Sequence, residues 1–188
     1  MDSRESEQDG QRAWEISGRS IQVAHENVRY LIERGPDFLE IRAQEGETVV
    51  ERSYTRRQGK IFIIEGSDHN GMEMRIHIDA TGSSLVTEAS IGDIEFRLET
   101  EPALHALQLT SKLKDGPKPE APRIKEFLDW VRSNKDARRE IFGGAERAIP
   151  QLPNGPIAVC VAICALCALE FVFACLRCLI CVETVESV

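Results

Sequence analysis

The chain has 188 residues, of which 42% are hydrophobic and 29% are charged. This composition excludes a collagen, a wholly disordered chain and a polytopic membrane protein. The 23 Lys and Arg residues stand against 31 Asp and Glu residues and leave a formal net charge of −8. Because a generic nucleic-acid-binding protein carries an excess of basic residues, we expect no nucleic acid among the partners.

The N-terminal segment combines a polar start with a predicted helix. Residues 1–12 contain no apolar cluster and no signal peptide, so we expect a disordered start and a head that stays in the cytoplasm. Over residues 19–34 apolar side chains recur at helical spacing, and Gly35 and Pro36 end the predicted helix. The apolar positions of this helix are Ile21, Ala24, Val28, Leu31 and Ile32.

Apolar and polar residues alternate with a period of two from Asp37 to Leu98. Strict alternation predicts half-buried strands, and Gly-containing breaks predict short turns between them. We expect six strands, at residues 38–43, 48–54, 60–65, 72–78, 84–89 and 93–98. The predicted fold class is therefore α+β, with an antiparallel sheet of about six short strands, flanking helices and a C-terminal apolar helix of transmembrane type.

Two further helices and two Pro-rich segments follow the strands. One helix is predicted over 102–114, with Ala103, Leu104 and Leu107 on its buried side. The expected organisation is a disordered start at 1–12, a head domain at 13–114, a Pro-rich linker at 115–122, an amphipathic helix at 123–144, a hinge at 145–156 and an apolar Cys-rich helix at 157–182.

The apolar tract at 157–182 contains only two charged residues, Glu170 and Arg177. A continuous helix of this length exceeds the ~30 Å hydrocarbon layer of a bilayer, so the tract predicts a membrane span. A span requires that Glu170 lies inside the membrane; otherwise the helix must stop there. Arg138, Arg139 and Arg147 precede the tract and no Lys or Arg follows it, which predicts a single-pass tail anchor with a cytoplasmic head.

All six cysteines of the chain lie in this tract, on one side of the predicted helix. Small residues along one helix side allow helices to approach closely in lipid, so we expect the tail to form a homo-oligomer. The residues expected at this contact are Cys160, Cys164, Cys167, Glu170, Ala174, Cys175, Arg177, Cys178 and Cys181.

The spacing of the cysteines also resembles that of zinc or iron–sulfur ligands, in Cys164-x2-Cys167 and Cys175-x2-Cys178-x2-Cys181. The intervening residues are mostly apolar and belong to a predicted straight helix, from which four thiolates cannot surround one ion. We therefore predict no metal and no cofactor.

A double glycine precedes the cysteines, in Phe142-Gly143-Gly144-Ala145. This C-terminal part of the chain resembles precursors of ribosomally made peptide bacteriocins, in which a leader is cut after a double glycine and a Cys-rich core is crosslinked. Ser133 and Arg138 stand where such leaders usually have apolar residues. The resemblance implies cleavage at Gly143 and Gly144, a secreted membrane-active peptide, and a head that acts as a leader or immunity domain.

The head shows no strong catalytic pattern. Its histidines, His25, His69, His77 and His105, are scattered, and no nucleotide-binding, metalloprotease or nucleophile-elbow motif occurs. We therefore predict no catalytic residue. The favoured function is a membrane-tethered binding or regulatory protein whose head has an unidentified protein partner; the alternative is the bacteriocin-like precursor.

Overall fold

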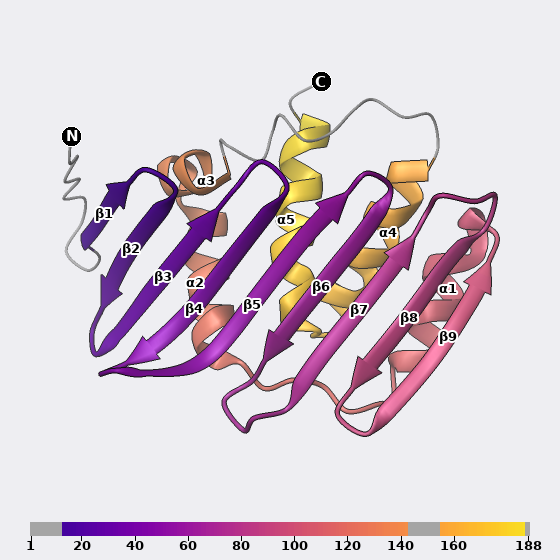
Figure 1. Cartoon of the computed structure of the whole chain (residues 1–188), viewed down its shortest axis with the longest axis horizontal. Coiled ribbons are helices and arrows are strands. Elements are labelled where there is room, and N and C mark those ends of the chain that lie inside the picture. Colours follow the sequence, from indigo (N-terminus) through magenta and orange to yellow (C-terminus); the bar gives the residue numbers. More distant parts are fainter. Residues whose placement is uncertain (1–12, 143–154, 187–188) are drawn as a thin grey trace.

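The structure, a computed structural model, describes residues 13–142 and 155–186 (Figure 1). Its centre is a nine-stranded antiparallel sheet in which every strand pairs with the next along the chain. The strands are β1 (Ala13–Ser17), β2 (Ser20–His25), β3 (Val28–Arg34), β4 (Phe38–Glu45), β5 (Thr48–Gln58), β6 (Ile61–Ser67), β7 (Glu73–Asp79), β8 (Leu85–Ile91) and β9 (Ile94–Thr100). The six predicted strands correspond to β4–β9, and three strands precede them.

The prediction of a helix over 19–34 is wrong, because this segment forms β2 and β3. Ile21, Val23, Val28, Tyr30 and Ile32 are buried, which is a period of two on each side of a tight turn. The turn contains neither Gly nor Pro; instead Glu26 takes a positive φ of 53°. Because apolar residues lie on both faces of β2 and β3, their spacing in the sequence resembles that of a helix.

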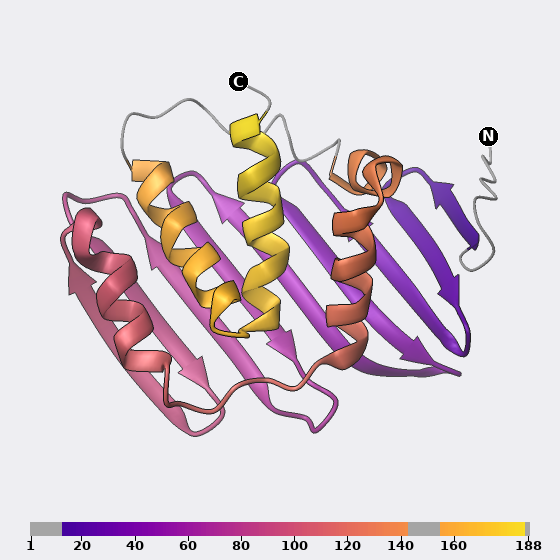
Figure 2. The ribbon, with the colours of Figure 1, turned by 180° about the vertical axis from the view of Figure 1, so that it is seen from behind.

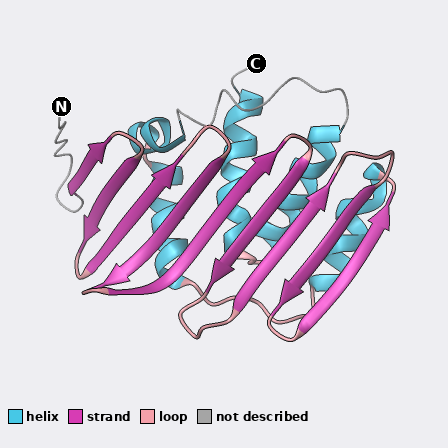
Figure 3. Ribbon diagram, viewed as in Figure 1, coloured by secondary structure: helices cyan, strands magenta, loops and turns pink. Residues whose placement is uncertain are grey.

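In the described part of the chain five helices follow the sheet, and they lie on one of its faces (Figures 1 and 3). They are α1 (Pro102–Leu113), α2 (Pro122–Ser133), α3 (Lys135–Phe142), α4 (Gly155–Ala168) and α5 (Val172–Glu186). Seen from behind the sheet in Figure 2, the spatial order is α2, α5, α4 and α1, so the last two helices lie between the first two.

The helices α1 and α2 differ in detail from the prediction. The helix predicted over 123–144 is divided at Asn134, whose backbone is extended and whose side chain accepts a hydrogen bond from the backbone N–H of Ala137 in α3. In α1 the buried side is formed by His105, Leu109 and Leu113. The predicted buried side is therefore wrong, and Leu104 and Leu107 are exposed.

The expected C-terminal transmembrane helix is contradicted by the structure. In the part of the chain that the structure describes, no helix has the length and apolarity that crossing a membrane requires. The chain turns at Glu170, and the two resulting helices are only about 21 Å and about 23 Å long. The helix therefore stops at Glu170, and a single continuous helix through this residue is not formed.

The core lies between the helices and the apolar face of the sheet. Val159, Ile163, Leu166, Phe171 and Phe173 of the C-terminal segment are fully buried in it. At Gly66 in β6 the backbone approaches the Phe173 ring of α5 so closely that a Cβ atom would overlap the ring. Gly66 therefore allows α5 to lie directly on the centre of the sheet.

We predict that Gly66→Ala lowers the free energy of unfolding by about 1–3 kcal/mol, because the methyl group and the Phe173 ring would have to share the same space. Chemical denaturation measures the change. Gly82→Ala is the matched control, since the nearest atoms to a Cβ at Gly82 are 3.9 Å away and its φ is not positive. Equal stability of Gly66→Ala and the wild type would contradict the close packing of α5.

Candidate functional site

The helices α4 and α5 form an antiparallel hairpin that is crosslinked along its length. Three disulfides join Cys160 to Cys181, Cys164 to Cys178 and Cys167 to Cys175, with Cα–Cα distances of 5.8, 4.8 and 4.7 Å. The C-terminal region is therefore Cys-rich, every cysteine pairs within the hairpin, and no disulfide joins the hairpin to the head.

The turn of the hairpin explains the position of Glu170. The N–H of Phe171 donates to the carbonyl of Leu166 (3.1 Å), and the N–H of Glu170 donates to that of Cys167 (3.0 Å). These two bonds form a Schellman motif, which needs a left-handed residue at the position of Glu170. Glu170 takes a φ of 69° and lies exposed at the turn, so its charge stays in water.

The hairpin lies in a slot whose walls are α1 and α2 and whose floor is the centre of the sheet (Figure 2). We call this slot the cradle. The helix α4 packs beside α1, whereas α5 packs beside α2 and over β5 and β6. The segment between Leu113 and Pro122 connects the two walls and runs below the hairpin in Figure 2.

The wall formed by α2 is fixed by a buried carboxylate. Glu51 of β5 accepts hydrogen bonds from the backbone N–H groups of Arg123 (3.1 Å) and Ile124 (2.7 Å), at the first turn of α2. These N–H groups have no partner within the helix, so the carboxylate replaces an N-cap side chain. Burial raises the pKa of Glu51 above its usual value, although the two hydrogen bonds oppose this rise.

The connection between the walls is fixed by Asp68, in the loop after β6. Its carboxylate accepts hydrogen bonds from the N–H groups of Asn70 (2.9 Å), Met72 (2.8 Å) and Glu120 (2.8 Å). Glu120 belongs to the segment that leads to α2. The polar loop therefore ties this segment to the sheet.

The wall formed by α1 is fixed by His105, which is fully buried. Its Nε2 lies 2.6 Å from the hydroxyl of Thr87 in β8, and its Nδ1 lies 2.6 Å from that of Thr100 in β9. A neutral imidazole donates one of these bonds and accepts the other. Burial lowers the pKa of His105, because the interior disfavours the charged ring.

The floor of the cradle contains an unusual polar strip. The residues of β5 that face the helices are Glu51, Ser53, Thr55 and Arg57, and all four are buried. Within the described residues, the hydroxyls of Ser53 and Thr55 have no hydrogen-bond partner. A buried hydroxyl without a partner costs about 1–3 kcal/mol, so these two side chains make the contact between the head and the hairpin less stable than apolar side chains would.

A buried cation lies at the same contact. Arg177 of α5 is 6% exposed, and its guanidinium carbon lies 5.2 Å from the centre of the Phe62 ring. The guanidinium carbon of Arg57 lies 5.5 Å from the centre of the same ring. Burial, and then the charge of Arg57, lower the pKa of Arg177 to about 10, so it remains charged at neutral pH.

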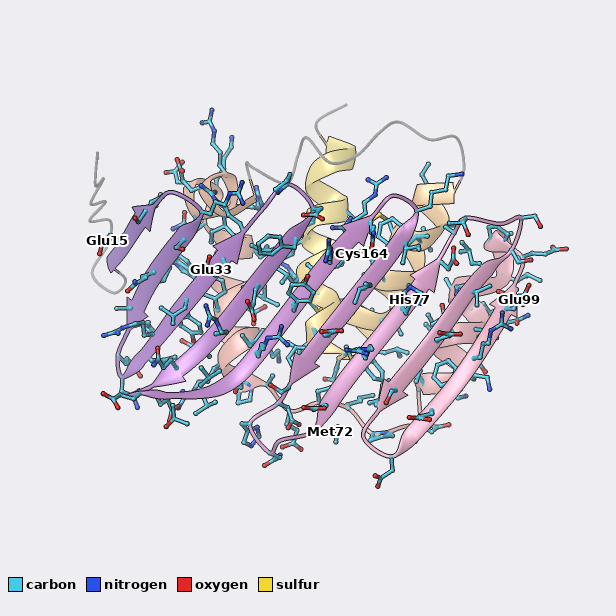
Figure 4. The ribbon with its side chains drawn as sticks, in the orientation of Figure 1. Glu15, Glu33, Met72, His77, Glu99 and Cys164 are labelled. Atoms are coloured by element: carbon cyan, nitrogen blue, oxygen red, sulfur yellow. A yellow bond between two sulfur atoms is a disulfide. The ribbon has the colours of Figure 1, made fainter. Side chains whose placement is uncertain are left out.

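The face of the sheet opposite the helices is open and polar, as Figure 4 shows for the side chains around His77. A hollow of about 690 Å³ lies there, lined by residues that include Glu65, Arg75, His77 and Glu88. Arg75 pairs with Glu65 (2.8 Å), and His77 lies 3.9 Å from Glu88. Arg75 and Glu65 neutralise each other across the two strands, so this pair gives the hollow no net charge.

The structure brings together most of the residues that we expected at a contact between tails. The six cysteines face one another within one chain, with Cys164 on α4 behind the sheet in Figure 4. Ala174 and Arg177 are buried in the cradle, whereas Glu170 is exposed. Association between two tails stays a prediction, and Gly143 and Gly144 lie outside the described residues.

Sequence reasoning missed several residues of the cradle: Glu51, Ser53, Thr55, Arg57 and His105. The first four carry a signal, since polar residues occupy every second position of a central strand. Among the described residues, no group of His, Cys, Asp and Glu side chains could hold a metal ion. A comparison with known proteins finds no match among the protein-family models, the curated proteins or the solved structures.

We predict that the contribution of His105 to the free energy of unfolding falls as the pH falls below about 6.5, the usual pKa of histidine. The unfolded chain binds a proton at His105 at a higher pH than the folded chain, so acid favours unfolding, with a slope of at most about 1.4 kcal/mol per pH unit. Above this window the contribution of His105 is complete.

Denaturation of the wild type and of His105→Gln between pH 5 and 8 isolates this effect. The glutamine keeps one donor and one acceptor but does not titrate. The difference in stability between the two proteins should shrink as the pH falls. A constant difference would show that His105 is not buried in its neutral form.

Proposed function

We propose that the protein is the precursor of a Cys-rich, membrane-active peptide, in which the head carries and shields the peptide until cleavage near Gly144 releases it. The main observation in support of this proposal is that all three disulfides form within the α4–α5 hairpin. Helices of this length are marginal alone in water, and crosslinks within the hairpin allow it to keep its shape after it leaves the sheet.

The surface of the hairpin supports this proposal. The helix α4 has no charged residue, and its side away from the sheet exposes Ile157 and Val161 by 63% and 53%. Both sides of α4 are therefore apolar, and removal from the cradle would expose Phe171 and Phe173 as well. An apolar surface of this kind favours transfer to a lipid membrane.

The floor of the cradle supports release. A permanent core strand would present apolar side chains to α5, but β5 presents Ser53, Thr55 and Arg57. Water would satisfy the hydroxyls of Ser53 and Thr55 once the hairpin leaves, which lowers the cost of separation. The cradle therefore shields the apolar surface of the peptide, while the polar residues of β5 limit the affinity between the head and the peptide.

The proposal also changes the expected location of the two parts. Disulfides persist in oxidising surroundings, so the crosslinked hairpin, and the head while it carries the hairpin, suit a compartment outside the reducing cytoplasm. The interpretation as a tail anchor depended on one continuous membrane-spanning helix, and we do not retain it.

We predict that the culture medium of the native host contains a peptide that begins at Ala145 and lacks the six thiol hydrogens. Mass spectrometry identifies it. The purified peptide should release dye from lipid vesicles, whereas the intact precursor should not, because its hairpin is held in the cradle.

The reduced and alkylated peptide is the control, since it keeps the composition but loses the crosslinks and should lose most of the activity. Two results would contradict the proposal: an uncleaved chain as the sole form in the host, or equal vesicle leakage by the intact precursor and the peptide.

A further inference from the structure

A second hollow, of about 670 Å³, lies between α2 and the turn of the hairpin. The head lines it with α2 and with the segment that connects α1 to α2, and the hairpin lines it with Cys167, Glu170, Val172 and Cys175. We call it the turn hollow. Of the three disulfides, the one between Cys167 and Cys175 therefore meets this hollow, and the hollow is open to the surface.

The direction of the side chains on α5 explains why this disulfide reaches the hollow. Phe173 packs against the sheet at Gly66. Successive residues of an α-helix are rotated by about 100°, so Cys175, two residues later, lies on the side of α5 away from the sheet. Cys181 follows Phe173 by eight residues, which turns its side chain back towards the sheet.

The burial of the cysteines agrees with these directions. Cys181 is 3% exposed, whereas Cys175 and Cys167 are half-buried. The disulfide next to the turn is therefore open to a partner in the turn hollow, while the core of the protein covers the Cys181 side of the outermost disulfide.

The other residues of the turn hollow suit contact with a protein. Leu128 and Val172 are nearly buried and apolar, and Lys125, Asp129 and Arg132 expose charges of both signs around them. Protein–protein contacts commonly combine an apolar centre with a polar rim of this kind.

We propose that the turn hollow is the site at which a dithiol exchanges with the Cys167–Cys175 disulfide. This site goes beyond the proposed function and does not depend on cleavage of the chain. The reaction needs only a partner with two thiols that can reach the hollow, and the lining favours a protein as that partner.

The exchange proceeds in two steps. A thiolate of the dithiol attacks Sγ of Cys175, the bond between the two sulfur atoms of the protein breaks, and the Cys167 thiolate leaves and takes a proton from water. The second thiol of the partner loses its proton to water and attacks the mixed disulfide, which releases Cys175 as a thiolate that is protonated in turn. The partner is oxidised to a disulfide, Cys167 and Cys175 are reduced to thiols, and an oxidised partner reverses both steps.

The exchange would act on the turn of the hairpin. Glu170 lies in the same hollow and holds a φ of 69°, a conformation that is unfavourable for residues other than glycine. The Cys167–Cys175 disulfide keeps α4 and α5 together beside this turn. Opening it would loosen the turn, while the two other disulfides still hold the rest of the hairpin together.

Partial reduction of the oxidised full-length protein tests the site. Dithiothreitol is added at a limiting concentration, samples are quenched over time with N-ethylmaleimide, and peptic digestion with mass spectrometry gives the rate at which each disulfide opens. We expect the Cys167–Cys175 disulfide to open at least tenfold faster than Cys160–Cys181. Equal rates for the three disulfides, or faster opening of Cys160–Cys181, would overturn the proposal, and this comparison requires only the wild type.

A variant that fills the turn hollow tests whether the dithiol enters through it. Asp129→Trp places a large side chain there, and we expect at least threefold slower opening of Cys167–Cys175 than in the wild type. Gln108→Trp is the matched control, because Gln108 is exposed on α1 and does not line the hollow, and it should react as the wild type does. An unchanged rate in Asp129→Trp would overturn the role of the hollow.

A second arm replaces dithiothreitol with reduced thioredoxin and so distinguishes a protein dithiol from a small one. Opening of Cys167–Cys175 by either reagent, slowed in Asp129→Trp, supports the site. Faster opening by thioredoxin at an equal concentration of dithiol indicates a protein partner. Failure of both reagents to open this disulfide first would overturn the site.

Discussion

The structure depends on how the centre of the sheet is covered. Nine consecutive antiparallel strands create one broad apolar face, and α1 and α2 cover only its two sides. Glu51, Asp68 and His105 hold these helices and their connection in place, so that a slot remains over β5–β7. Within the described residues, only the α4–α5 hairpin fills this slot. The last helices of the chain therefore complete a core that the preceding elements leave open.

This arrangement makes the hairpin both necessary and separable. It buries large aromatic side chains, among them Phe171 and Phe173, which the folded state needs. It is also crosslinked only to itself, and the strip of β5 beneath it is polar. The hairpin therefore contributes to the folded core and also has its own crosslinks. These two properties are the basis of the proposal that the head carries the hairpin as a peptide to be released.

The sequence predicted the strands that carry a strict alternation and Gly-containing turns, which are β4–β9. It failed at β2 and β3, where the Glu26–Asn27 turn has no Gly and apolar residues such as Leu31 lie on the open face. The sequence also predicted the wrong buried side for α1. The buried side contains His105, a polar residue whose partners Thr87 and Thr100 come from the strands β8 and β9. Local periodicity cannot anticipate such tertiary partners.

The candidate site was partly visible in the sequence. Helical spacing placed the six cysteines on one line, but it could not show that the line folds back on itself, because Glu170 is an uncommon residue for a left-handed helix end. An apolar segment with few charges is compatible with a membrane and with a protein core. Two features place this segment in the protein core: the positive φ at Glu170, which turns the chain back, and the centre of the sheet, which α1 and α2 leave uncovered.

The most direct test of this account is the map of disulfides in the full-length protein purified under non-reducing conditions. Peptic digestion and mass spectrometry should recover three nested crosslinks, Cys160 with Cys181, Cys164 with Cys178 and Cys167 with Cys175. A continuous C-terminal helix cannot form the outermost pair, because its two cysteines would lie about 30 Å apart. Six unpaired thiols, or crosslinks between separate chains, would contradict the hairpin and the covering of the sheet that depends on it.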